Sequence, residues 1–325
     1  MGIALNAVYQ LSRMLPDVAL RPSQNVLTLG VQDCYFTQAQ LQAFLVKHQL
    51  PHADVPEGEV ELTAGFRHLS GPGREPYLKN THQRTLFQNL GYHPRRVQGL
   101  DVSDFEGAEY VHDLNLPVPA AWHGQFDFIF DGGTVEHVFS IKEAFYNLAR
   151  LCRVGGVCAH FSPTDLINHG FINLNYHIFQ DFYSRNGFEC VQMKYVAVPC
   201  DTAEADQYLL EIEPEALRFP VYGYRLYTCC AFRKTSVQEL QIPTQGFYRE
   251  LYEKIARDAQ APAEPPPPPP PAPPPPVAPP PARRSMWKKL KRALGITPAK
   301  TPPASPPAPP PPPWAQMPPH VRVEL

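Results

Sequence analysis

The fold is decided by three segments: RVQGLD (residues 96–101), AEYVHD (108–113) and FDFIFD (126–131), the last of which is followed by two glycines. Each is a short, largely apolar run that ends in an aspartate. An earlier run, NVLTLG (25–30), ends in glycine, and a later one covers 157–161. Short apolar runs bounded by turn residues are typical of buried strands in a parallel sheet.

Stretches with helical spacing of apolar residues separate these strands. These predicted helices cover residues 3–15, 37–48, 81–91, 141–152, 175–186 and 244–257. Two further strands are predicted near 189–198 and 224–233. Strands that alternate with helices predict an α/β fold, with a mostly parallel sheet covered by helices on both faces. We divide the chain into a helical lead-in (1–24), an α/β domain (25–235, with a loop or lid at 50–79) and a C-terminal helix (236–260). A disordered, proline-rich basic tail is expected over 261–325.

Composition changes sharply at residue 261. Of the 41 prolines, 27 lie between residues 261 and 325, and this tail has a net charge of +6 against −8 for residues 1–260. An acidic body argues against a core that binds nucleic acid. A body of this length can bury a full hydrophobic core.

The sequence predicts a cytoplasmic protein. It contains no run of 18 apolar residues, and its first residues lack the basic and apolar regions of an export signal. The seven cysteines form no CxxC pair, which favours free thiols in a reducing compartment. Cys229 and Cys230 are expected to point to opposite faces of one strand.

The predicted strand ends converge on one crevice, because open α/β sheets bind ligands at the carboxyl ends of their strands. Asp101 is suited to accept hydrogen bonds from two ribose hydroxyls. Gly30 allows close approach to the backbone, and Asp113 can accept from an adenine amine. These residues predict an adenosine site, although acids at strand ends are also common simply because such ends are solvated.

The stretch from Val97 to Pro163 resembles the broad type 11 group of class I S-adenosylmethionine-dependent methyltransferases. The resemblance is carried by GLDVS, AEYVHDLNLP, FDFIFDGGTVEHVF, AFYNLARLCRVGG and AHFSP, and extends over about 25–235. It implies a Rossmann-like methyltransferase fold with S-adenosylmethionine as cofactor. It further implies a ribose contact for Asp101, adenine contacts for Asp113 and Leu114, and a methionine side lined by Asp131, Gly132 and Gly133. Glu136 and His137 would then lie near the methyl group.

The first strand departs from that group. Thr28 stands where an acid is usual, and Gln32 stands where a second glycine is usual. The resemblance therefore leaves the amino-acid part of the cofactor to Gln32 or Asp33. A nicotinamide dinucleotide is disfavoured, because neither GxGxxG nor GxxxxGK[ST] is present.

Three residues are candidates for catalysis. His137 and His169 can take a proton from an oxygen or nitrogen acceptor, and Glu136 can orient the cofactor. Each is equally compatible with a packing or capping role. No metal site is predicted, because the spacing of His160, Asp165, His169 and His177 does not place them on one helical face. Metal-dependent methylation of a catechol remains as an alternative.

The tail combines two proline-rich stretches, 265–281 and 298–319, with a basic amphipathic segment at 285–295. Polyproline II structure is expected for the two proline-rich stretches. The basic amphipathic segment predicts binding to an anionic membrane surface or a protein partner, with a solubilising spacer as the alternative.

Together these observations predict a methyltransferase that acts on an oxygen or nitrogen of a small-molecule or glycan-type acceptor. Two alternatives stay open. One is a non-catalytic scaffold of the same fold whose proline-rich tail recruits partners, and the other is a nucleotide-sugar enzyme. The protein is expected to be cytoplasmic, or peripheral to the membrane through its tail.

Overall fold

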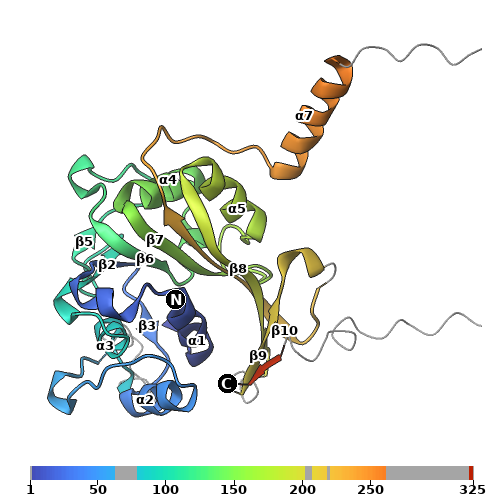
Figure 1. The fold of residues 1–325 in the computed structure, drawn as a ribbon. Coiled ribbons are helices and arrows are strands. Elements are labelled where there is room, and N and C mark those ends of the chain that lie inside the picture. Colours follow the sequence, from blue (N-terminus) through green and yellow to red (C-terminus); the bar gives the residue numbers. More distant parts are fainter. Residues whose placement is uncertain (1, 63–78, 202–206, 218–219, 261–321, 325) are drawn as a thin grey trace, which may run out of the picture. The chain divides into compact units, whose positions relative to one another are not determined.

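A computed structural model describes residues 2–62, 79–201, 207–217, 220–260 and 322–324 (Figure 1). Part of the loop at 50–79 and most of the tail, including 265–281, 285–295 and 298–319, therefore lie outside the described residues. The tail differs from the prediction at its end, where β11 (Arg322–Glu324) pairs antiparallel with β9 (Tyr208–Ile212). None of the described helices is both long and apolar enough to cross a membrane.

One nine-stranded sheet organises the body. Its order is β11-β9-β8-β10-β7-β6-β2-β4-β5. The strands not yet given are β2 (Val26–Leu29), β4 (Val97–Asp101), β5 (Tyr110–Val111), β6 (Phe126–Asp131), β7 (Cys152–Pro163), β8 (Phe188–Pro199) and β10 (Tyr224–Lys234). A separate parallel pair joins β1 (Gly2–Ile3) to β3 (Asp33–Cys34).

The strand directions identify the architecture. β5, β4, β2, β6 and β7 are parallel, in the order 3-2-1-4-5 of a doubly wound sheet. β10 then runs antiparallel between β7 and β8. β9 also runs against the parallel strands, because it pairs antiparallel with β8. This mostly parallel sheet, with the antiparallel strand β10 inserted next to the last of the five parallel strands, has the Rossmann-like class I methyltransferase fold.

Helices cover both faces of the sheet, as alternating side chains on the strands require. Phe128 and Phe130 of β6 pack into one core cluster with α1 (Leu5–Met14), α2 (Gln38–Lys47) and α3 (Gln83–Asn89). Ile129 packs into the opposite cluster with α4 (Ile141–Leu151) and α5 (Tyr176–Arg185), which lie along one face in Figure 1. Cys229 and Cys230 divide between these clusters, which confirms that they point to opposite faces.

The topology places a switch point between β2 and β6. The connections from these two neighbouring strands lead to opposite sides of the sheet, which opens a crevice at their carboxyl ends. Gly30 directly follows β2, and Gly132 directly follows β6. These two glycines therefore mark the position at which a fold of this kind binds its ligand.

The final described helix is α7 (Gly246–Gln260), close to the prediction for 244–257. The third predicted strand is shorter than expected, since β5 covers only Tyr110–Val111. Asp113 thus lies beyond the strand end, in a turn where its carboxylate accepts hydrogen bonds from the backbone and side chain of Asn115.

Candidate functional site

Gly30 and Asp101 meet at the carboxyl ends of β2 and β4. Gly30 has a φ of +71°, which favours glycine, and its N–H donates to the carbonyl oxygen of Leu100. A Cβ built on Gly30 would lie 3.6 Å from Oδ2 of Asp101. A ligand that approaches the backbone at Gly30 would therefore meet the carboxylate expected to hold a ribose.

The side chain of Gln32 lies between the carboxyl ends of the neighbouring strands β2 and β6. Its Nε2 donates to the carbonyl oxygen of Leu29 and to Oγ1 of Thr134. A Cβ built on Gly132 would lie 2.6 Å from Oε1 of Gln32, so Gly132 is required for this packing. Oε1 is buried and has no hydrogen-bond partner among the described residues.

Gln83 of α3 fixes the start of this loop, and sequence reasoning missed it. Its Oε1 accepts hydrogen bonds from Oγ1 of Thr28 and from the backbone N–H of Gln32. The side chain of Thr28 is therefore buried, and its hydroxyl is hydrogen-bonded to a side chain of α3. The only signal available in the sequence was a glutamine near the start of the amphipathic helix predicted over 81–91.

Asp131 corrects the expectation that its carboxylate lines the methionine side of the cofactor. The side chain is fully buried, and its Oδ2 accepts hydrogen bonds from Nδ1 of His160 at 2.8 Å and from Oγ of Ser162 at 3.3 Å. Nε2 of His160 in turn contacts the hydroxyl of Tyr183 at 2.8 Å. The carboxylate is thus occupied inside the protein.

Leu114 was expected to contact the adenine. It is buried in the core cluster that contains α4, and its carbonyl oxygen accepts from Nδ2 of Asn147. Asp113 is exposed and engaged with Asn115. These contacts involve Oδ1 of Asp113 and the carbonyl oxygen of Leu114, and the adenine contacts expected for both residues stay predictions.

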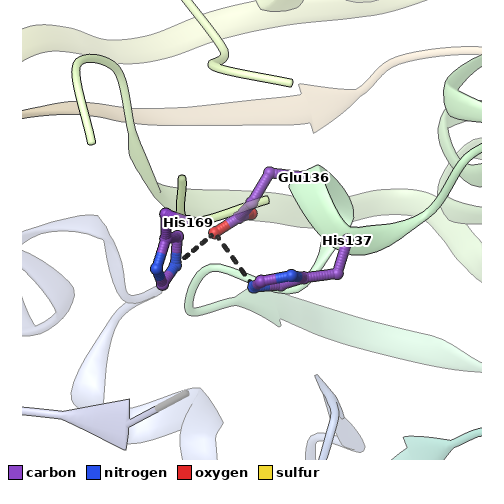
Figure 2. A group of neighbouring side chains, drawn as sticks. All are labelled: Glu136, His137 and His169. Atoms are coloured by element: carbon purple, nitrogen blue, oxygen red, sulfur yellow. Dashed lines mark ion pairs between the residues drawn. The ribbon is translucent and has the colours of Figure 1, made fainter. Parts of the chain in front are cut away.

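Glu136, His137 and His169 come together from two separate parts of the chain (Figure 2). Glu136 and His137 belong to the 3-10 turn η7 (Val135–His137), and His169 lies in the loop after β7. Oε1 of Glu136 is 3.6 Å from Nε2 of His169 and 4.0 Å from Nε2 of His137. The two imidazole rings lie 5.0 Å apart.

Burial sets the electrostatics of this cluster. Glu136 has no exposed surface, and both its carboxylate oxygens lack a hydrogen-bond partner among the described residues. Burial, with the nearby charge of Asp131, raises the pKa of Glu136 to about 8. Burial also lowers the pKa of His137 and that of His169, so both imidazoles are neutral at neutral pH.

The four residues rejected above as a metal site are not gathered into one. His160 is held between Asp131 and Tyr183, and the carboxylate of Asp165 accepts from the backbone N–H of Leu226. Within the described ranges, the one group of three or more side chains with metal-ligand geometry is Glu136, His137 and His169.

A cavity of about 840 Å³ adjoins the cluster. His169, Gly132 and the loop residues Leu166–Asn168 form part of its wall. The rest comes from β1, α1, the segment 35–40, the ends of β7 and β8, and the first residues of β10. The volume suits a small molecule.

Comparisons with known proteins give likenesses among solved structures only. No protein-family model and no curated protein matches the chain. The chain is similar to a putative sarcosine dimethylglycine methyltransferase from Galdieria sulphuraria (11% identity, TM-score 0.36), covering 71% of this chain and 84% of that one. It is also similar to 1,6-didemethyltoxoflavin-N1-methyltransferase from Burkholderia thailandensis, solved with 1,6-didemethyltoxoflavin and S-adenosylhomocysteine (14% identity, TM-score 0.36). That match covers 71% of this chain and 79% of the other.

A third likeness lies outside methyl transfer. The branched-chain polyamine synthase of Thermus thermophilus, solved with N4-aminopropylspermidine and 5'-methylthioadenosine, is 15% identical with a TM-score of 0.35. The match covers 73% of this chain, which spans only 58% of that protein. At such values the fold assignment rests on the strand order and directions of this chain itself.

Proposed function

We propose that this protein is an S-adenosylmethionine-dependent methyltransferase that acts on an oxygen or nitrogen of a small-molecule or glycan-type acceptor. The observation that carries the proposal is the meeting of Gly30 and Asp101 at the switch point of the sheet. A glycine with positive φ and a neighbouring carboxylate suit a ligand that carries a ribose.

The residues around the switch point fit the cofactor. Asp101 would hold the ribose hydroxyls, and Gly30, Gly132 and Gly133 would let the cofactor approach the backbone. Oε1 of Gln32 is a buried acceptor that lacks a donor, and the ammonium group of the cofactor would supply one. Asp113 and Leu114 would flank the adenine, whereas Asp131 is left out of this assignment because its carboxylate is fully buried and hydrogen-bonded inside the protein.

The bound cofactor supplies an electrophilic methyl group on its sulfonium. The chain has to exclude water, align the acceptor with that methyl group and accept a proton from the acceptor. The cavity beside Gly132 would hold the acceptor. His169 lies at its wall, next to Glu136 and His137, and the three would promote loss of the acceptor proton, the neutral imidazoles acting as bases in the simplest scheme.

Calorimetric titration of the full chain with S-adenosylhomocysteine, and separately with NAD, tests the proposal. We expect binding of S-adenosylhomocysteine alone. Asp101→Ala should abolish it without lowering the melting temperature of the ligand-free protein, and Asp101→Asn should weaken it while keeping an acceptor for the N–H of Ser103. Asp104→Ala is the matched control, because Asp104 is exposed in the same loop.

A non-catalytic scaffold predicts a different outcome. The side chain of Gln32 already occupies space beside Gly132, and Thr28 is bound to Gln83 instead of facing a ligand. If the full chain does not bind S-adenosylhomocysteine at millimolar concentration, the methyltransferase proposal fails and the scaffold function is favoured.

A further inference from the structure

We propose that Glu136, His137 and His169 form a binding site for one divalent transition-metal cation beside the 840 Å³ cavity, whose wall includes His169. The site itself does not depend on the proposed methyl transfer. The part of the inference that concerns the acceptor, given below, rests on that function.

The spacing of the three ligand atoms suits a shared cation. One oxygen of Glu136 and one ring nitrogen of each histidine all lie within 4.8 Å of one another. The two carboxylate–imidazole distances, 3.6 and 4.0 Å, exceed those of normal hydrogen bonds. Nitrogen and oxygen ligands bind zinc at about 2.0–2.2 Å, which puts neighbouring ligand atoms roughly 3–3.5 Å apart. Small side-chain rotations would therefore close the site.

The burial of Glu136 is an independent observation that points to a ligand. The carboxyl group of Glu136 has no exposed surface and no hydrogen-bond partner in the described part of the chain, which makes it costly to bury. Figure 2 shows this carboxylate pointing toward both imidazole rings, one on its own turn and one on the loop after β7. A cation held between the three side chains would neutralise the carboxylate and satisfy an otherwise unpaired oxygen.

The backbone holds the two halves of the site together. The N–H of Phe171 donates to the carbonyl oxygen of Glu136 at 2.9 Å, which ties the loop of His169 to the turn η7. The carboxylate of Asp131 accepts from the N–H groups of Thr134 and Val135 at the start of that turn. The three ligand side chains are thus positioned before any cation arrives.

The donor set indicates the class of metal. Two neutral imidazoles and one carboxylate suit Mn²⁺, Fe²⁺, Co²⁺ or Zn²⁺ better than Ca²⁺, which prefers an all-oxygen shell. Three protein ligands leave coordination positions open. Because His169 lines the cavity, a molecule in the cavity can fill them.

Under the proposed function, this arrangement favours an oxygen acceptor. A hydroxyl bound to the cation would lose its proton more readily, because a divalent cation lowers the pKa of a bound oxygen. The oxygen would then attack the methyl carbon, the carbon–sulfonium bond would break, and S-adenosylhomocysteine would leave with the bonding electron pair. The histidines act here as ligands, and the acceptor proton leaves to solvent.

Titration of the chelator-treated full chain with Co²⁺ tests the site, because the visible absorption of bound Co²⁺ reports nitrogen and oxygen ligation. We expect one tight equivalent in the wild type. Glu136→Gln and His169→Ala should each weaken it by at least ~10–100-fold, the range seen even for outer-shell changes. His123→Ala removes an exposed histidine from another loop and should leave it unchanged.

The folding of the variants is checked by thermal melting without metal. Glu136→Gln keeps the shape of the side chain and cannot become charged, so it should melt no lower than the wild type, whereas Co²⁺ should raise the midpoint of the wild type only. Absence of a Co²⁺ equivalent, or equal binding by all variants, overturns the inference. Metal binding without S-adenosylhomocysteine binding would overturn the proposed function alone, and the reverse result the metal site alone.

Discussion

Asp131 connects the core of the protein to its candidate site. One carboxylate oxygen accepts from His160 and Ser162 in the next strand, and the other accepts from the backbone of the turn that carries Glu136 and His137. Burial alone would raise the pKa of Asp131, but the hydrogen bond and charge of His160 and the two backbone N–H groups outweigh it and lower the pKa. Asp131 is therefore a positioning residue that stays ionised.

Replacing Asp131 tests this role. Asp131→Ala leaves the ring of His160 and two backbone N–H groups without their acceptor. We expect the free energy of unfolding to fall by about 3–5 kcal/mol, as when one partner of a buried pair is removed. Urea denaturation measures it. The control Asp104→Ala, at an exposed position, should stay within about 0.5 kcal/mol of the wild type, and equal losses in both variants would refute the assignment.

The same residue gives a pH dependence with a defined sign. Because folding lowers the pKa of Asp131 below its ordinary value of 3.8, the unfolded chain binds more protons as the pH falls. The stability that Asp131 contributes should be complete above that value and should disappear as the pH falls through its folded pKa. The difference in unfolding free energy between wild type and Asp131→Ala, measured from pH 7 downward, should therefore shrink in acid. A constant difference would contradict the prediction.

At the scale of elements, the loop after β7 and the turn η7 are pressed together at Gly170. A Cβ on Gly170 would lie 2.7 Å from the carbonyl oxygen of Glu136 and 2.9 Å from its Cγ. Gly170→Ala should push His169 away from Glu136, weaken Co²⁺ binding and cost about 1–3 kcal/mol of stability, as overpacking does.

Gly58→Ala is the matched control for Gly170→Ala. Gly58 lies in the short turn η2 (Glu57–Glu59), and nothing lies within 4 Å of a Cβ built on it. Melting and Co²⁺ titration of the two variants give the comparison. If both retain wild-type Co²⁺ affinity, close packing at Gly170 does not position the site.

Elements governed by local rules could be predicted from the sequence. Thr37 begins α2 with a capping box to Gln40, and β6 ends at Asp131 as its apolar run indicates. β9 was missed, and so were the two-residue strands β1 and β3, because segments so short carry little periodicity. The strand predicted over 108–113 was too long, because Asp113 forms a local turn with Asn115 that competes with strand pairing.

The site could be predicted only residue by residue. Glu136, His137 and His169 each stood out, but their convergence depends on the path of the loop after β7, which no local pattern encodes. The partner of Asp131 depends on strand register, since β6 and β7 place Asp131 directly opposite His160. A sequence shows that both strands exist without fixing how they align.

For the whole molecule, the sheet order decides where function can reside. The parallel strands β2, β4, β6 and β7 bring Gly30, Asp101, Gly132 and the loop of His169 to one edge. The antiparallel strands extend the sheet away from the switch point and end at β9, whose outer edge is covered by β11. Unpaired edges invite association with other chains, so a short covering strand protects this one.

Removing residues 322–325 tests that covering role. Arg322, Val323 and Glu324 pair with Leu210, Leu209 and Tyr208, so their loss should expose backbone N–H groups of β9 to solvent. Hydrogen exchange measured by mass spectrometry should accelerate in a peptide covering 207–212 and stay unchanged in one covering 157–161 of the central β7. Because local opening at an edge does not require global unfolding, the melting temperature should change little. Unchanged exchange in 207–212 would show that β11 does not protect β9 in solution, whereas faster exchange in both peptides would mean that the last residues stabilise the whole sheet.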